Sequence, residues 1–313
     1  MTHRLAIVIP VYNEENAIVP NMETLLHVLA EDDIEARIIL VDDGSTDLSW
    51  LSVKAVADAH PNVQGLRLSR NFGKEAAICA GLENADAELY LVMDSDLQHP
   101  PRYIREMLRL MEETGADIVE GVKRSRGREG VKSKILAKAF YRVMKAASGL
   151  DLDNSSDFKL MRRPVVDALR ALGESSVFFR GITSWVGFAR AEMPFAVDPR
   201  EHGASRFSTM RLMKLALNSI LSYTSKPLYI TVLFGAAFFV GALILGVQTL
   251  VNFFTGNTIS GFTTVILLLL ITGSLILLCL GIIGIYVSRI YNEVKRRPRY
   301  ILSDKTRTAG ESS

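Results

Sequence analysis

Cysteine and histidine are scarce in this sequence. Only two of its 313 residues are cysteines and five are histidines, and Cys279 lies within a long apolar segment. Two cysteines cannot build a disulfide framework, and so few scattered histidines do not provide the ligand spacing of a zinc site. The sequence therefore excludes a disulfide-stapled scaffold and does not favour a zinc enzyme.

Charge is absent from one long stretch. Residues 227–288, a run of 62, contain no Asp, Glu, Lys or Arg. Because about 20 apolar residues cross a bilayer, we predict a transmembrane hairpin with spans over 228–254 and 262–287. The alternative, a hydrophobic hairpin buried in a soluble core, is disfavoured by the length of the uncharged run.

Basic residues flank this hairpin on both sides. Lys214 and Lys226 precede it, and residues 289–313 carry seven basic and three acidic residues. The positive-inside rule then predicts that both flanks are cytoplasmic. We expect 289–313 to form a basic cytosolic tail that is attracted to anionic lipids, or one that only fixes the orientation.

Glycine-rich phosphate-binding motifs are also missing. Neither G-x-G-x-x-G after the first strand nor G-x-x-x-x-G-K-[ST] occurs, so a dinucleotide site or a P-loop has no support. The first 226 residues nevertheless alternate apolar strands near 5–9, 37–41, 65–68 and 88–93 with helical segments near 17–30, 48–59 and 75–84. This alternation predicts an α/β domain with a mostly parallel sheet.

Polar clusters follow the expected strand ends, at 12–14, 42–43, 70–71 and 94–96. Ligands of such sheets bind beyond the carboxyl ends of the strands, so these clusters predict a site. The carboxylates of Asp94 and Asp96 suit a divalent cation that also binds a diphosphate, and Gln98 could add an amide oxygen. A solvated acidic turn is the alternative.

Together these segments resemble the inverting glycosyltransferases of family 2, and more narrowly the polyisoprenyl-phosphate glycosyltransferases such as the dolichol-phosphate mannose and bactoprenol glucose enzymes. The motifs are I-P-V-Y-N-E at 9–14, V-D-D-G-S-T-D at 41–47, R-N-F-G at 70–73 and M-D-S-D-L-Q-H-P-P at 93–101. Similarity continues through D-F-K-L-M at 157–161 to about residue 300. The resemblance implies a GT-A (Rossmann-like) domain followed by two transmembrane helices.

The resemblance also implies roles for single residues. Asp94, Asp96 and Gln98 match the metal group, which holds Mg²⁺ or Mn²⁺ against the diphosphate of a sugar nucleotide. The positions that match nucleotide-sugar binding are Pro10, Tyr12, Glu14, Val41, Asp43, Ser95, Lys123, Arg126, Arg200 and Arg206. Relatives often carry Arg where this chain has Lys123, and usually Lys where it has Arg206.

Asp157 matches the residue proposed as the catalytic base. A phosphate monoester has a second pKa near 6, so an acceptor phosphate needs little deprotonation at pH 7. Asp157 could instead orient the acceptor or balance charge at the sugar. A helix cap is the purely structural interpretation.

Two basic segments with apolar faces, 131–148 and 206–222, are typical of helices in the membrane interface. We predict that they hold the site against the bilayer and offer cations to a lipid phosphate. Two core-packed helices with solvated lysines are the alternative.

These inferences divide the chain into a cytosolic catalytic domain (1–226), a transmembrane hairpin (227–288) and the basic tail. The expected reaction is the transfer of glucose, with inversion, from UDP-glucose to a polyprenyl phosphate such as undecaprenyl phosphate, for cell-envelope glycosylation at the bacterial inner membrane. Membrane lipids and further copies of the chain are the expected partners, and nucleic acid is not. The alternatives are a GDP-mannose or UDP-amino-sugar donor, or a catalytically silent membrane scaffold.

Overall fold

The computed structural model describes residues 3–123, 156–174, 178–195, 226–255 and 261–306. The chain divides into two compact units, an α/β unit that includes the residues after 296 and a unit that contains the two long apolar helices. The predicted interfacial helices at 131–148 and 206–222 lie outside the described residues.

The α/β unit is built on an eight-stranded sheet with the order β7-β5-β6-β4-β1-β2-β3-β8. Its strands are β1 (His3–Val11), β2 (Ala36–Asp42), β3 (Val63–Leu68), β4 (Ala87–Val92), β5 (Ile118–Lys123), β6 (Lys159–Arg162), β7 (Arg190–Phe195) and β8 (Leu302–Lys305). The central strand β1 runs parallel to β2 and β4, and β2 runs parallel to β3. β6 is antiparallel to β4 and β5, whereas β7 is parallel to β5. The mostly parallel GT-A-like sheet predicted from the sequence is confirmed.

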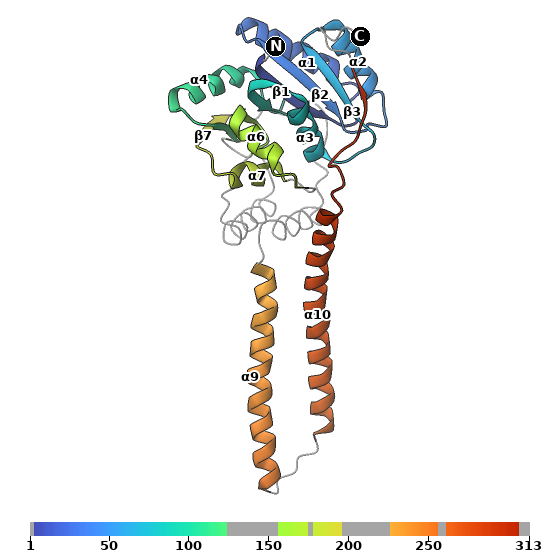
Figure 1. Ribbon diagram of the computed structural model, residues 1–313, viewed down its shortest axis with the longest axis vertical. Helices are drawn as coiled ribbons and strands as arrows, with labels where there is room; N and C mark the ends of the chain where they lie inside the picture. The colour runs from blue at the N-terminus through green and yellow to red at the C-terminus, as the bar shows by residue number, and fades with distance from the viewer. Residues whose placement is uncertain (1–2, 124–155, 175–177, 196–225, 256–260, 307–313) are drawn as a thin grey trace. The chain divides into compact units, whose positions relative to one another are not determined.

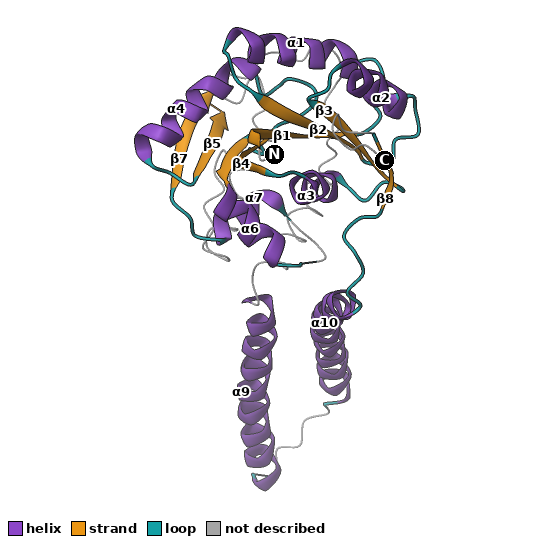
Figure 2. Cartoon of the chain, turned by 45° about the horizontal axis from the view of Figure 1, so that its top comes forward, coloured by secondary structure: helices purple, strands orange, loops and turns teal. Residues whose placement is uncertain are grey.

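Helices cover both faces of this sheet (Figure 2). They are α1 (Ile18–Glu31), α2 (Ser49–Ala59), α3 (Lys74–Asn84), the short 3₁₀ helix η1 (Pro101–Tyr103), α4 (Ile104–Thr114), α6 (Arg163–Ala171) and α7 (Phe179–Trp185). Alternation along β1 explains the two layers, because successive side chains of a strand point to opposite faces. Leu5, Ile7 and Ile9 pack with α1, α2 and α4, whereas Ala6 and Val8 pack with α3, α6 and α7.

The segment after the second long helix returns to the sheet. β8 pairs antiparallel with β3 at the edge. Ser69 N donates to Ile301 O at 2.8 Å, and Gly65 N donates to Thr306 Oγ1 at 2.8 Å. The expectation that 289–313 forms only a basic tail is therefore corrected, because Leu302–Lys305 is a strand of the α/β unit. This strand forms hydrogen bonds with β3, whose edge would otherwise be open.

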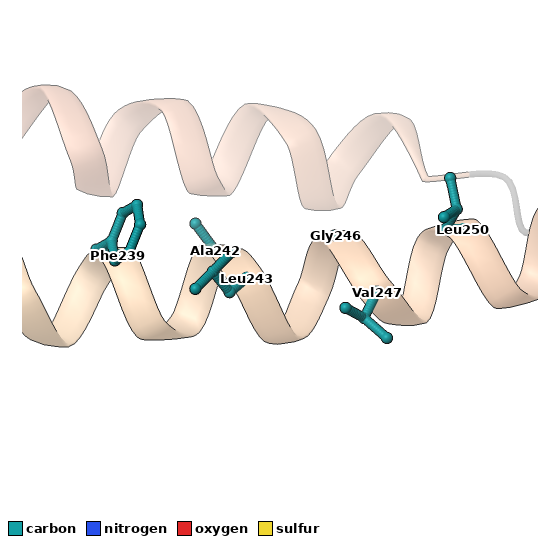
Figure 3. A pocket seen from close by; sticks show the side chains of 6 residues that line it. All are labelled: Phe239, Ala242, Leu243, Gly246, Val247 and Leu250. Carbon is teal, nitrogen blue, oxygen red and sulfur yellow. The ribbon is translucent and has the colours of Figure 1, made fainter.

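The described part of the second unit contains α9 (Lys226–Phe254) and α10 (Phe262–Val294), which lie side by side (Figure 1). Both are long and apolar enough to cross a membrane, over Thr231–Asn252 and Leu268–Val294. One shallow groove on α9 is lined by Phe239, Ala242, Leu243, Gly246, Val247 and Leu250 (Figure 3). Its apolar lining suits acyl chains or another helix rather than a polar ligand.

Candidate functional site

The loops after β1 and β2 are joined by hydrogen bonds at the carboxyl end of the sheet. Asn13 N donates to Ser45 Oγ at 3.0 Å, and Glu14 N donates to Ser49 Oγ at 2.7 Å. Asn13 has a positive φ of 53°, a conformation that asparagine tolerates better than most residues. These hydrogen bonds tie the main chain of the loop after β1 to the segment that follows β2.

Asp43 binds the loop that follows β3. Its two carboxylate oxygens accept hydrogen bonds from Phe72 N at 2.7 Å and Gly73 N at 2.9 Å. Burial raises the pKa of Asp43, and the two N–H donors oppose that rise. The adjacent Gly44 has φ +63°, and a Cβ there would lie 2.3 Å from the Arg70 carbonyl carbon. Asp43 and Gly44 therefore set the path of the loop that leads into α3.

The other residues expected to hold the nucleotide differ in exposure. Tyr12 is 43% exposed, while Ser95 is buried and its carbonyl accepts a hydrogen bond from Asn21 Nδ2 at 2.7 Å. Pro10 and Val41 face each other in the β1–β2 register and are buried. The Val41 side chain packs in the core, so the expected role of Val41 in nucleotide binding falls to its main chain.

The acidic turn follows β4. Asp96 is exposed, and its Oδ1 accepts a hydrogen bond from Gln98 N at 3.1 Å. Asp94 N donates to Nδ1 of the buried His99 at 3.2 Å. His99 stacks on Phe158 at a centroid distance of 5.0 Å. The histidine ring thereby fixes the backbone of the turn, a role that the sequence analysis missed.

Glu14 lies close to this turn, where burial and nearby negative charges disfavour its ionised form. Burial, together with the charges of Asp96 and Asp94, raises its pKa to about 7 even though a hydrogen bond with Ser95 opposes the shift. Its buried Oε2 receives no hydrogen bond from the described residues. Acidic groups gathered in this way are stabilised by a cation.

The turn fits a divalent metal that brings further ligands with it. Within the described ranges, no group of three or more Asp, Glu, His or Cys residues is arranged to hold a metal. The turn itself supplies the carboxylates of Asp94 and Asp96. Mg²⁺ typically binds one or two carboxylates and completes its shell with water and substrate phosphates. The residues present therefore suit a metal that binds together with a diphosphate.

Asp157 is paired with two cations. Arg180 donates from Nε to Oδ1 at 2.7 Å and from Nη2 to Oδ2 at 3.0 Å, and Lys74 Nζ lies 2.6 Å from Oδ2. Burial alone would raise the pKa of Asp157, but Arg180 and Lys74 hold it well below its usual range. The carboxylate is therefore ionised throughout the physiological pH range, which suits orientation and charge balance better than general-base catalysis.

Lys74 also contacts the acidic turn, with Nζ 2.6 Å from Asp94 Oδ1. Burial would lower the pKa of Lys74, but Asp94 and Asp157 raise it above its ordinary value. The neighbouring Glu75 accepts a hydrogen bond from Phe179 N at 2.8 Å. Burial and the charge of Asp157 raise the pKa of Glu75 to about 7. These contacts join α3 and α7 around Asp157.

A buried ion pair is formed by Lys159, two residues after Asp157 in the chain, and Glu120. Lys159 is fully buried, and its Nζ is 2.9 Å from Oε1 of Glu120, its cross-strand partner. Burial lowers the pKa of Lys159, and Glu120 opposes that shift.

The sequence analysis assigned no role to Lys74, Glu75, Arg180 or the Glu120–Lys159 pair. The position of Lys74 in the sequence could have indicated a functional role, because the helix dipole disfavours a lysine in the first turn of a helix.

Four expected phosphate-binding residues have no described side chain. Lys123 ends β5, but its side chain lies outside the described part of the structure, as do Arg126, Arg200 and Arg206. Charge interactions, a hydrogen bond and the shared contacts of Lys74 thus link Glu14, Asp94, Asp96, Gln98 and Asp157. Tyr12 and Asp43 directly follow β1 and β2, and the basic set stays an expectation.

Comparisons with known proteins show the family of the chain. The profile of glycosyl transferase family 2 matches residues 6–170. The chain is 34% identical to the uncharacterized glycosyltransferase YkcC of Bacillus subtilis, covering 95% of this chain and 92% of that protein. It is 33% identical to the bactoprenol glucosyl transferase of Shigella phage SfII, covering 97% and 99%.

Among solved structures, the glucosyl-3-phosphoglycerate synthase of Mycobacterium tuberculosis in complex with Mn²⁺, UDP-glucose and phosphoglyceric acid is 17% identical, with a TM-score of 0.48 over 71% of this chain and 79% of that chain. The family profile and the curated relatives carry the assignment, because the profile spans more than half of the chain and the relatives align with almost all of it. The chain belongs to glycosyl transferase family 2 and is a glycosyltransferase.

Proposed function

We propose that this enzyme transfers glucose from UDP-glucose to a polyprenyl phosphate such as undecaprenyl phosphate, with inversion at the anomeric carbon. One observation carries the proposal. The match to the bactoprenol glucosyl transferase of Shigella phage SfII covers 97% of the chain, so it includes the site loops and both apolar helices. A lipid-linked acceptor explains why a sheet with a polar site is joined to helices that can cross a membrane.

The proposed reaction is an in-line displacement. A phosphate oxygen of the acceptor forms a bond to the anomeric carbon, while the bond from that carbon to the diphosphate breaks and UDP leaves with the electron pair. The acceptor phosphate is mostly ionised at pH 7, because its second pKa is near 6. Little proton transfer is then required, which agrees with an Asp157 that stays ionised between Arg180 and Lys74.

Asp94, Asp96 and Gln98 would hold the metal, and Mg²⁺ or Mn²⁺ supplies Lewis-acid stabilisation of the leaving diphosphate when bound. Tyr12, Glu14 and Asp43 border the nucleotide side, together with the main chain around Pro10, Val41 and Ser95. Lys123, Arg126, Arg200 and Arg206 are the proposed phosphate contacts. Asp157 orients the acceptor phosphate or balances charge at the sugar.

The proposed location is the bacterial inner membrane, with both termini cytoplasmic and cell-envelope glycosylation as the biological use. The basic residues that flank α9 and α10 support this orientation. Homo-oligomers through the two helices are part of the proposal, and chemical cross-linking in native membranes tests them.

A donor-competition assay tests the reaction. Full-length protein in detergent receives undecaprenyl phosphate, Mn²⁺ and labelled UDP-glucose, UDP-N-acetylglucosamine or GDP-mannose in separate tubes, and label is counted in the organic phase. We expect label from UDP-glucose alone, lost with EDTA and in Asp96→Ala. Label from another donor would change the sugar in the proposal but would leave the proposed type of reaction unchanged. No transfer and no nucleotide binding in correctly folded protein would contradict the proposal and favour a silent scaffold.

A further inference from the structure

One ammonium group is shared by two carboxylates in the site. Lys74 Nζ lies 2.6 Å from Asp94 Oδ1 and 2.6 Å from Asp157 Oδ2. The two acids adjoin neighbouring antiparallel strands: Asp94 follows β4 and Asp157 precedes β6, and Val92 of β4 is the partner of Lys159 of β6. Extending this register by two residues places Asp94 opposite Asp157. Like charges opposite each other repel, and Lys74 offsets that repulsion.

The two contacts of Lys74 are not equivalent. Asp157 keeps the bidentate Arg180 as a partner if Lys74 leaves. In the described part of the chain, the basic groups near the Asp94 carboxylate are Lys74 Nζ at 2.6 Å and His99 Nδ1 at 4.0 Å. Because that histidine nitrogen accepts the Asp94 N–H hydrogen bond, Asp94 depends mainly on Lys74. The local helix gives no other reason for this lysine, since the positive end of the α3 dipole disfavours a cation there.

We propose that Lys74 is the resident counter-cation of Asp94, and that it makes divalent-metal binding depend on the sugar nucleotide. This inference rests on the metal site of the proposed function. A metal ion that arrives alone must displace the ammonium from Asp94. A metal ion that arrives with a diphosphate brings phosphate oxygens as ligands and negative charge that the displaced ammonium can contact.

The geometry allows Lys74 to change partners. The side chain is 40% exposed, and lysine carries its charge on a flexible four-carbon stem with three N–H donors. Its contact with Asp157 can persist while its contact with Asp94 is exchanged. Lys74 is therefore a positioning residue that couples metal and nucleotide binding.

Metal affinity measured without turnover tests this role. Mn²⁺ binding to the full-length protein in detergent is followed by electron paramagnetic resonance, with and without UDP, for the wild type and Lys74→Gln. We expect Lys74→Gln to bind Mn²⁺ alone at least about fivefold more tightly, and the gain in Mn²⁺ affinity caused by UDP to fall by a similar factor. Arg180→Gln is the matched control, because it removes a cation that is bound to Asp157 through two hydrogen bonds; its Mn²⁺ affinity should change less.

The outcomes separate this inference from the proposed function. Equal or weaker Mn²⁺ binding by Lys74→Gln overturns the role of Lys74 and leaves the metal site standing. No Mn²⁺ binding by either protein, even with UDP, overturns the metal site and this role with it. Lys74→Met, which keeps the stem without the charge, is measured in the same way, so that the result does not depend on the folding of one variant.

Discussion

Asp157 and Arg180 form a bidentate ion pair, with Nε–Oδ1 and Nη2–Oδ2 distances of 2.7 and 3.0 Å. Such a pair fixes the plane of the carboxylate as well as its charge. Asp157 precedes β6 and Arg180 lies in α7, so the pair also joins two elements at the site. The proposed role of Asp157 in orienting an acceptor requires a carboxylate that neither rotates nor titrates, and this pairing provides both properties.

The first prediction concerns the pH dependence of Asp157→Asn. Because Arg180 and Lys74 hold the pKa of Asp157 well below its usual range, Asp157 does not titrate between pH 5 and pH 9. We expect the variant to lower kcat by about 10²-fold, the size of a lost electrostatic contact at the transition state. The acid limb of the profile of kcat/KM against pH should keep its midpoint. Loss of the acid limb in Asp157→Asn would instead identify Asp157 as a titrating base.

The second prediction concerns Glu14 and stability. Its pKa is raised from 4.5 to about 7, so the folded state favours the protonated carboxyl. That contribution is complete below pH 4.5 and is lost as the pH rises through 7. Glu14→Gln mimics the protonated form, and its Tm should exceed that of the wild type by more at pH 8 than at pH 5. Thermal unfolding in EDTA measures this, with the exposed Glu35→Gln as a control that should show no such difference.

The third prediction concerns Asp43. Its two oxygens accept hydrogen bonds from Phe72 N and Gly73 N. An asparagine has one acceptor oxygen, so Asp43→Asn turns one N–H toward an amide group that cannot accept it, at a cost of about 1–3 kcal/mol. We expect a lower Tm and a higher KM for the sugar nucleotide. Asp58→Asn on the exposed face of α2 is the control; a similar fall in Tm there would remove the explanation.

Sequence patterns predicted the parts of the fold that depend on local hydrophobic periodicity. The continuous apolar run at 5–9 reads as a strand buried on both faces, and Leu5 and Ala6 do pack on opposite sides of the sheet. The rule that ligands bind beyond the carboxyl ends of parallel strands then predicted a site at the clusters that contain Asp43 and Asp94. Those inferences needed no knowledge of distant contacts.

The rest depends on long-range geometry. The pairing of Lys74 with Asp94 and Asp157 joins residues up to 83 positions apart, and no local pattern encodes it. β8 is four residues long and alternates in burial, so its sequence resembles a polar tail. It becomes a strand because β3 offers an open edge.

The last prediction concerns this edge strand. The buried Thr306 accepts a hydrogen bond from Gly65 N through Oγ1 at 2.8 Å. Thr306→Val keeps the shape of the side chain but leaves the Gly65 N–H without that acceptor, which should destabilise the α/β unit by about 1–3 kcal/mol. Ser303→Ala is the control, because Ser303 Oγ makes an exposed contact of 3.3 Å to Arg67 O that water can replace. Thermal unfolding should show a clear fall in Tm for Thr306→Val only. Equal Tm values for the two variants would mean that the hydrogen bond from Gly65 N to Thr306 Oγ1 adds nothing to stability.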